Sequence, residues 1–329
     1  MKAVKWTQYG PPEGLQLGEA EKPTPKDNEV LVKIHAASVT AGDCEIRASN
    51  VPAWLWLPIR LFTGLTKPRK NITLGQELAG EVEAVGKGVT EFKVGDAVFA
   101  ATGFSFGGYA EYVCLPAESD DSVLASKPSN VSYEEAAVVP VAGLEALHFL
   151  SAAHIQRGES VLILGAGGSI GTFGLQLARH HGAEVTAVDS AGKLDFLRSI
   201  GADQVIDYAQ EDFTRNGQQY DVIFDVIGKS HYARSLQALK PGGRYLLPNA
   251  GPAEMLRGRW TSLTSDKKII VGPARRNPAD LNRLKELIEA GTIKPVIDQI
   301  YPLEQIAAAH RYADSGQKQG NIAITVSSG

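Results

Sequence analysis

Apolar and polar positions follow two different patterns along the chain. From residue 1 to about residue 125, short apolar or alternating runs are separated by Gly, Pro and Asp, which is typical of strands joined by turns. Strands are expected at residues 1–6, 29–36, 78–85, 97–101 and 109–115. Because no helical periodicity separates these runs, we predict a barrel-like domain.

From about residue 126 to 272, apolar strands alternate with segments of helical periodicity, which is typical of an α/β fold with a parallel sheet. Strands are expected at residues 160–164, 184–189, 204–208, 220–227, 243–248 and 267–272, with helices near 170–179, 193–200 and 231–239. Six strands with intervening helices predict a doubly wound sheet. We expect the remaining segments, helical at 279–290 and 303–313 and extended at 321–326, to return to the first domain. The predicted domains are therefore residues 1–125 with 273–329, and residues 126–272.

The segment from residue 51 to residue 70 departs from both patterns. It is loop-like and very apolar, with Trp54, Trp56 and Phe62 close together, and it ends in a Lys-Pro-Arg-Lys run. Three interpretations are open for it. They are a hydrophobic wall or lid over a substrate pocket, packing against the barrel, and a helix on a membrane surface.

A glycine-rich turn joins the strand at 160–164 to the helix that follows. It consists of Gly165, Ala166, Gly167, Gly168, Ser169, Ile170 and Gly171. Glycine suits such a turn because the turn is tight and a pyrophosphate approaches the N–H groups at the helix N-terminus, where side chains would intrude. Asp189 ends the next strand, where an acidic residue accepts hydrogen bonds from the adenosine ribose. A tight strand-to-helix turn without a dinucleotide is the alternative.

Composition and charge limit the class of protein. The 43% hydrophobic and 21% charged residues are ordinary for a soluble globular protein, and a net charge of −4 predicts no nucleic-acid partner. Only two cysteines occur, Cys44 and Cys114, so we expect a reducing compartment and a cytoplasmic location. No apolar run approaches the ~18 residues of a membrane-spanning helix.

In the order and spacing of its motifs, the chain resembles the zinc-free quinone oxidoreductase branch of the medium-chain dehydrogenase/reductase superfamily. The matching segments are residues 36–43, 75–98, 107–111 and 140–144, the glycine turn, and residues 201–203, 205–208 and 240–243. The resemblance implies a GroES-like catalytic domain and a Rossmann domain. It also implies hydride transfer from NAD(P)H to quinones or α,β-unsaturated carbonyls, which delocalise the charge of the arriving hydride.

The resemblance further implies that zinc is absent. Zinc-dependent members hold the metal with a Cys, a His and a second Cys, whereas this chain has Thr40, Gln76 and no Cys near Pro140 at those positions. Catalytic zinc needs three protein ligands and an open position. Two rival functions are a non-catalytic cofactor-binding protein, of crystallin-like or RNA-binding type, and a zinc-dependent alcohol dehydrogenase.

The resemblance places the substrate beside Thr40 and Asp43, in a cleft between the two domains. The hydroxyl of Thr40 can donate a hydrogen bond to the reduced substrate, and water is an alternative proton source. The strand at 267–272 is expected at a sheet edge, and because exposed edges tend to be paired, it predicts a homodimer.

The choice between NAD(H) and NADP(H) is open. Asp189 favours NAD because a carboxylate accepts the ribose hydroxyls and repels a 2′-phosphate. Ser190, Lys193 and Tyr208, however, stand at positions that surround this phosphate in NADP-dependent relatives.

Overall fold

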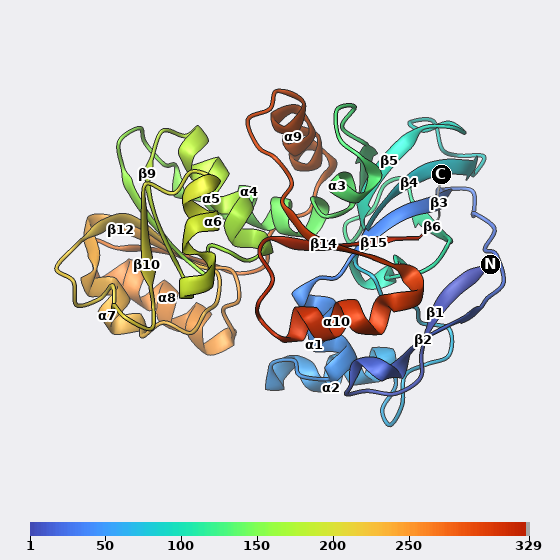
Figure 1. Cartoon of the computed structure of the whole chain (residues 1–329), viewed down its shortest axis with the longest axis horizontal. Coiled ribbons are helices and arrows are strands. Elements are labelled where there is room, and N and C mark those ends of the chain that lie inside the picture. The colour runs from blue at the N-terminus through green and yellow to red at the C-terminus, as the bar shows by residue number, and fades with distance from the viewer. Residues whose placement is uncertain (327–329) are drawn as a thin grey trace. The chain divides into compact units, whose positions relative to one another are not determined.

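The computed structural model describes residues 1–326, and its internal contacts divide the chain into two units. The first unit contains Met1–Val141, Arg276–Ala290 and the segment from Pro295 onward; the second contains Ala142–Arg275 and Gly291–Lys294. In Figure 1 the first unit is mainly blue, teal and dark red, and the second is mainly green, yellow and orange.

The first unit is built on a seven-stranded sheet in the order β14-β15-β3-β4-β5-β7, with β6 also paired to β3. Its strands are β3 (Glu29–Ser38), β4 (Glu77–Val85), β5 (Ala97–Ala101), β6 (Tyr112–Pro116), β7 (Val123–Ser126), β14 (Ile297–Pro302) and β15 (Asn321–Thr325). A separate antiparallel pair is formed by β1 (Lys2–Trp6) and β2 (Leu15–Glu19). Because β15 pairs with β3, the dark red end of the chain returns to its blue beginning in Figure 1.

Alternation along β3 builds the core of this unit. Val30, Val32 and Ile34 lie at every second position and are fully buried against Leu78 and Leu115 of the neighbouring strands. The helices of the unit are α1 (Ala41–Ala48), α2 (Ala53–Thr63), α3 (Tyr133–Ala137), α9 (Pro278–Glu289) and α10 (Ile306–Asp314). Helix α4 (Pro140–Ala153) carries the chain from the first unit into the second.

The apolar stretch expected to be loop-like is a helix. Residues 53–63 form α2, which follows Pro52 at its N-cap and ends at Gly64, whose φ of 124° stops the helix. Pro58 lies inside α2, and this residue type made the stretch look irregular because proline lacks the N–H of a regular turn. Only Thr63 of α2 is buried, so the helix leaves most of its apolar side chains exposed or half-exposed.

The second unit confirms the predicted doubly wound sheet. Six parallel strands occur in the order β10-β9-β8-β11-β12-β13. The strands are β8 (Ser160–Leu164), β9 (Glu184–Asp189), β10 (Gln204–Asp207), β11 (Tyr220–Asp225), β12 (Leu239–Leu247) and β13 (Lys268–Val271). The helices are α5 (Ser169–His180), α6 (Leu194–Ser199), α7 (Tyr232–Gln237) and α8 (Pro252–Thr264).

The strand order creates a point where the winding direction reverses. The chain begins at β8, moves outward through β9 to β10, and then returns to β11 on the other side of β8. Right-handed crossovers in these two directions place their helices on opposite faces of the sheet. A crevice therefore opens at the carboxyl ends of β8 and β11, which is where ligands bind in sheets of this type.

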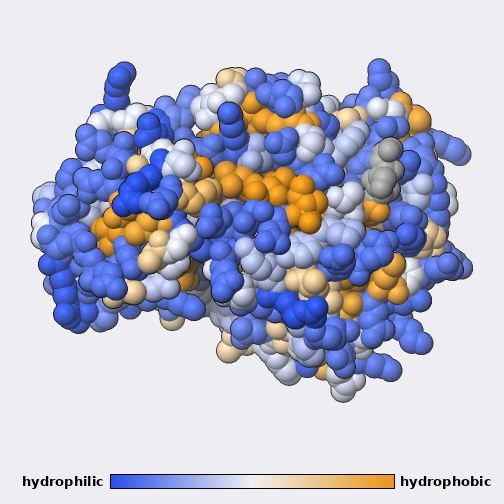
Figure 2. Space-filling model, in the orientation of Figure 1, coloured by the Kyte–Doolittle hydropathy of each residue, from blue (hydrophilic) through white to orange (hydrophobic). Residues whose placement is uncertain are grey.

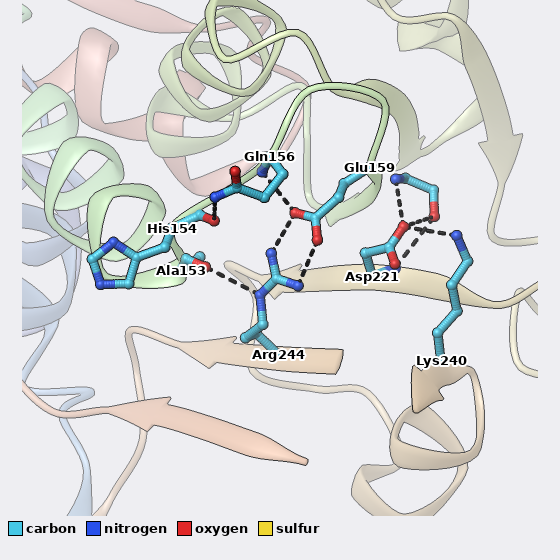
Figure 3. Close-up of polar contacts among 8 residues, drawn as sticks. Ala153, His154, Gln156, Glu159, Asp221, Lys240 and Arg244 are labelled. Atoms are coloured by element: carbon cyan, nitrogen blue, oxygen red, sulfur yellow. Dashed lines mark hydrogen bonds and ion pairs between the residues drawn. The ribbon is translucent and has the colours of Figure 1, made fainter. Parts of the chain in front are cut away.

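Ion pairs join the strands at the amino ends of this sheet, as Figure 3 shows. Arg244 of β12 forms a bidentate pair with Glu159, just before β8, and donates from Nε to the carbonyl oxygen of Ala153 at 3.1 Å. Lys240 donates to Asp221 of β11 at 2.7 Å. These contacts link the end of α4 to three strands, and the hydrogen bond from Arg244 lowers the pKa of Glu159.

Candidate functional site

The glycine turn lies at the carboxyl end of β8, beside the reversal point. Gly165 has a φ of 79°, and a Cβ atom on it would lie 2.6 Å from Cγ1 of Ile227. A Cβ atom on Gly171 would lie 2.3 Å from the carbonyl oxygen of Gly165 and 2.6 Å from Cα of Ala166. These two positions therefore exclude any side chain, because real Cβ atoms do not approach so closely.

The rest of the turn presents backbone N–H groups. Gly168 is the N-cap of α5, and Thr172 is the first residue to bond back along the helix, from its N–H to the carbonyl oxygen of Gly168 at 3.0 Å. The N–H groups of Ser169, Ile170 and Gly171 thus lie in the first turn, before the helical ladder begins. This terminus carries the positive end of the helix dipole and fits a pyrophosphate.

Asp189 at the end of β9 holds the turn in place. Its Oδ2 accepts the N–H of Gly167 at 2.8 Å, and its Oδ1 accepts the N–H of Ser190, also at 2.8 Å. Lys193 lies 3.5 Å from Oδ1, and both charged side chains are almost completely buried. The carboxylate is therefore compensated by one cation and two amides before any ligand arrives.

A cavity of about 620 Å³ lies at the carboxyl ends of the strands of the second unit. Leu164, Gly165 and Val188 line it, so it borders the glycine turn, and Tyr208 lines it with a largely exposed ring. The structure therefore brings Tyr208 to the cavity beside the turn. Asp189, Ser190 and Lys193 lie next to the turn but are not among the lining residues.

Sequence reasoning missed other residues that line this cavity. They include Asp212, Phe213, Asp225, Ile227, Lys229, His231 and Arg234. Asp225 ends β11, and it fixes the following loop by accepting the N–H of Gly228 at 2.8 Å and the hydroxyl of Tyr245 at 2.9 Å. Asp225 could have been predicted as a cavity residue from the sequence, because it ends a strand of the sheet and ligands bind at the carboxyl ends of such strands.

In the first unit, Thr40 and Asp43 form the N-terminal cap of α1. The Thr40 hydroxyl oxygen accepts the N–H of Asp43 at 3.0 Å, and the Asp43 carboxylate accepts the N–H of Thr40 at 3.1 Å. The Thr40 hydroxyl also lies 2.7 Å from Asp43 Oδ2 and 3.0 Å from Gln76 Oε1. Asp43 is fully buried, whereas Thr40 is 8% exposed.

A wider buried network surrounds Asp43. Its Oδ1 accepts the N–H of Gly75 at 3.1 Å, and the Tyr109 hydroxyl also bonds to it. Tyr109 in turn lies 3.1 Å from Nε2 of His310, whose Nδ1 is 3.4 Å from the Cys44 sulfur. Burial raises the pKa of Asp43 to about 6 and lowers that of His310 to about 3. The imidazole is therefore neutral at physiological pH.

A second buried carboxyl group lies near this network. Glu77 of β4 accepts hydrogen bonds from the Ser38 hydroxyl and, at 2.7 Å, from the N–H of Val141. Burial, opposed by these bonds, raises the pKa of Glu77 to about 7. Within residues 1–326, no group of three or more His, Cys, Asp or Glu side chains is arranged to hold a metal ion. No helix of the same residues is long and apolar enough to cross a membrane.

Two family models match the chain. The alcohol dehydrogenase GroES-like domain matches residues 26–127, and the zinc-binding dehydrogenase model matches residues 200–324. The first match lies within the first unit, the second covers the end of the second unit and the last segments of the first, and the glycine turn lies between the two matched ranges.

Proteins of known activity are similar over nearly the whole chain. Quinone oxidoreductase of Sus scrofa is 32% identical over 94% of this chain and 93% of its own. The 2-methylene-furan-3-one reductase of Solanum lycopersicum is 31% identical, and the chloroplastic NADPH-dependent alkenal/one oxidoreductase of Arabidopsis thaliana is 30% identical. Each of these two matches covers 98% of this chain and 79% of the relative.

Solved structures agree. The quinone oxidoreductase from Coxiella burnetii superposes with a TM-score of 0.87 at 28% identity, over 99% of both chains. Escherichia coli quinone oxidoreductase complexed with NADPH superposes with a TM-score of 0.81 at 26% identity, over 99% of this chain and 100% of that one. On its fold, its glycine turn and this similarity, the chain belongs to the quinone oxidoreductase branch of the medium-chain dehydrogenase/reductase superfamily.

Proposed function

We propose that the protein is a NAD(P)H-dependent reductase of quinones or α,β-unsaturated carbonyls that works without zinc. The observation that carries this proposal is the glycine turn at the reversal point of the sheet, with the cavity beside it. Relatives named as quinone and alkenal/one oxidoreductases support the choice of acceptor. When bound, the reduced nicotinamide supplies a hydride to the acceptor.

The residues of the second unit fit the dinucleotide. The N–H groups from Ser169 to Gly171 would hold the pyrophosphate, and Gly165 and Gly168 keep side chains away from it. Tyr208 would pack against the adenosine from the cavity wall. Asp189 fixes the turn and would accept hydrogen bonds from the ribose.

Thr40 is the proposed hydrogen-bond donor to the carbonyl oxygen of the acceptor, whose negative charge grows as the hydride arrives. When Asp43 is ionised, the Thr40 hydroxyl donates to it; when Asp43 is protonated, the carboxyl group can donate to Thr40 and release the threonine proton for the acceptor. Asp43 is thus a positioning residue. The Thr40→Val variant should lose about 100-fold in kcat, as expected for a lost oxyanion donor, whereas Thr40→Ser should retain most activity.

The zinc-independent part of the proposal rests on Thr40 and Gln76. A hydroxyl and an amide 3.0 Å apart are poor zinc ligands compared with the thiolate and imidazole that zinc prefers. Full activity after exhaustive dialysis against a chelator, with less than about 0.1 zinc per chain by elemental analysis, would support zinc independence. Activity that is lost with the metal and restored by zinc would refute it.

For the cofactor, we propose that the protein accepts both NADH and NADPH. The Asp189 carboxylate favours the ribose hydroxyls, whereas the adjacent Lys193 cation favours a 2′-phosphate, so the two preferences offset one another. Fluorescence titration should give dissociation constants within about tenfold of one another, a difference of no more than ~1.4 kcal/mol. Asp189→Asn should shift the preference toward NADPH, and Lys193→Met toward NADH. A preference above about 100-fold would contradict this balance.

The experiment that tests the reaction measures oxidation of NADH and NADPH in the presence of benzoquinones, naphthoquinones and enones. Rapid turnover of at least one acceptor class, lost in Thr40→Val with unchanged cofactor binding, is the expected result. Cofactor binding without turnover of any acceptor would favour the rival, a non-catalytic cofactor-binding protein. Turnover confined to simple alcohols and aldehydes would favour an alcohol dehydrogenase.

We also propose a homodimer formed through β13. This strand is the last in its sheet, and the neighbouring α8 exposes Leu256, Trp260 and Leu263, each at 70% or more. An edge strand beside such a patch favours pairing with a second copy. Light scattering should report twice the mass of one chain, and Leu263→Glu should reduce the measured mass to that of a single chain. A monomer at all concentrations would exclude the dimer.

A further inference from the structure

Helix α2 carries an apolar surface that the proposed reaction does not use. Trp54, Trp56, Leu57, Leu61 and Phe62 are each between 42% and 54% exposed, although they occur within nine consecutive residues. Trp54, Leu57, Leu61 and Phe62 recur at helical spacing and share one exposed face of α2, whereas Trp56 lies on another side, where the Arg60 guanidinium is 5.4 Å from its ring. A contiguous exposed apolar face of this kind is often an interaction site. Figure 1 places α2 at the periphery of the first unit, next to α1.

The helix is held firmly to the unit at its C-terminal end. The Tyr9 hydroxyl donates to the carbonyl oxygen of Gly64 at 2.6 Å and lies 2.7 Å from the Thr63 hydroxyl, while the guanidinium of Arg60 stacks on the Tyr9 ring at 3.6 Å. Ile59 packs against the core of the unit and Phe62 contacts Phe106, while the opposite face of α2 is exposed. The contacts at its C-terminal end therefore hold α2 in place while Trp54 and Trp56 remain exposed.

Between Glu45 of α1 and Glu77 of β4, the charged residues that flank α2 in the sequence are all basic. Residues 46–76 contain five Lys and Arg residues and no Asp or Glu, in a chain whose net charge is −4. Arg47 is buried and paired with Asp314, but Lys67, Arg69 and Lys70 are exposed and make no ion pair within the described part of the chain. The segment that follows α2 thus carries three exposed basic side chains, one of which, Arg69, donates to the carbonyl oxygen of Leu61 at 2.9 Å.

We propose that α2 and the basic segment at residues 64–70 dock on the surface of an anionic lipid bilayer. Exposed tryptophans beside leucines and lysines are the composition of helices that lie in the interface between headgroups and acyl chains. At eleven residues, α2 is long enough to lie there and too short to span. Lys67, Arg69 and Lys70 would meet the lipid phosphates.

Charge also separates this occupant from the alternatives. A second copy docked through the same face would bring two sets of like charges together, which is unfavourable. A lid over an apolar substrate requires the apolar side chains but has no need of the basic border. The exposed patch on α8 differs, because Glu254 lies on that helix with Arg257 and Arg259.

Vesicle binding of the full chain tests the proposal. We expect co-sedimentation with phosphatidylcholine vesicles that contain about 30% phosphatidylglycerol, and at least tenfold weaker binding to pure phosphatidylcholine. About 0.5 M salt should weaken the binding by a similar factor because it screens the basic residues. Tryptophan emission should shift to shorter wavelength on binding.

Two sets of variants separate the apolar and the charged contributions. Trp54→Ser with Trp56→Ser, and separately Lys67→Gln with Arg69→Gln and Lys70→Gln, should each reduce affinity for anionic vesicles at least tenfold. All these positions are exposed, so circular dichroism should show an unchanged fold. Val94→Ser removes a 62% exposed apolar side chain from another part of the first unit and should leave vesicle binding unchanged.

Three outcomes would overturn the proposal. They are absence of vesicle binding, equal affinity for neutral and anionic vesicles, and equal binding by the wild type and the double tryptophan variant. A mass reduced by half in the α2 variants would instead identify a second copy as the occupant. A raised KM for a water-soluble quinone, without vesicle binding by the wild type, would identify a substrate lid. Because vesicle binding is measured without cofactor or acceptor, its failure is independent of the proposed reaction.

Discussion

Gly171 in the first turn of α5 allows a quantitative test of the glycine turn. In Gly171→Ala, the new methyl group would lie 2.3 Å from the Gly165 carbonyl oxygen and 2.6 Å from Cα and the carbonyl oxygen of Ala166. All three are backbone atoms, so no side-chain rotation relieves the contact. Overpacking of this kind costs about 3 kcal/mol. The better helix propensity of alanine returns about 1 kcal/mol, which leaves a net loss of about 2 kcal/mol.

Gly168→Ala is the matched control within the same turn. Its methyl group would lie 3.5 Å from the Gly165 carbonyl oxygen, an ordinary contact, and its φ of −86° suits any residue. Replacing a glycine N-cap by alanine costs only a fraction of about 1 kcal/mol. Gly168→Ala should therefore keep the fold but weaken dinucleotide binding, because its methyl group lies at the predicted pyrophosphate site.

Thermal unfolding without cofactor, followed by circular dichroism, measures the first effect. At roughly 2–4 °C per kcal/mol, Gly171→Ala should lower the Tm by about 4–8 °C and Gly168→Ala by no more than about 2 °C. Titration with NADPH measures the second effect. Equal Tm values for Gly171→Ala and the wild type would refute the steric reasoning, and unchanged NADPH affinity in Gly168→Ala would refute the position assigned to the pyrophosphate.

Three further predictions concern buried and half-buried groups. Arg244→Met should lower the free energy of unfolding by about 2 kcal/mol, because it leaves the half-buried Glu159 without its cation. Lys240→Met, at the more exposed ion pair with Asp221, should lower it by less than about 1 kcal/mol. Urea unfolding compares the two variants, and equal losses would contradict the burial argument. Burial raises the pKa of Asp43 to about 6 (from 3.8) and that of Glu77 to about 7 (from 4.5), so the folded state holds these protons more tightly than the unfolded state. The free energy of unfolding should therefore fall as pH rises from about 4 to about 7, and Glu77→Gln should flatten this slope. A wild-type stability that rises across the same window would overturn the assignment. Burial raises the pKa of the Cys44 thiol to about 12, so this cysteine should react with a maleimide at pH 8 only after unfolding. Mass spectrometry detects the labelled chain. Rapid labelling of the native protein would show instead that the thiol is accessible.

Local chemistry made the second unit predictable. The apolar strand that ends at Leu164, the glycines that follow it and Asp189 at the next strand end form a pattern set by neighbours in sequence, and all three lie where the pattern placed them. The character of residues 53–63 was not predictable in the same way. Pro58 and the even spread of apolar residues concealed a helix whose exposed face obeys no core-facing periodicity.

The buried network around Asp43 could not be predicted from the sequence. Tyr109 and His310 are 201 residues apart in the sequence. They meet because α10 and the segment that carries Tyr109 pack into the same hydrophobic cluster of the first unit. No local pattern records such a contact. The cavity residues His231 and Arg234 were missed for a related reason, since their segment reads as an ordinary helix and only the strand order brings it to the cavity.

The bond between Asp189 and the glycine turn limits how this protein can change its cofactor during evolution. The carboxylate that we propose to face the ribose also accepts the N–H of Gly167, so replacing it by a small residue would both favour a 2′-phosphate and release the turn. A lineage that moves toward strict NADPH use through this position must therefore keep an acceptor there or gain stability elsewhere first. In this fold, cofactor preference and the rigidity of the phosphate-binding turn are selected together.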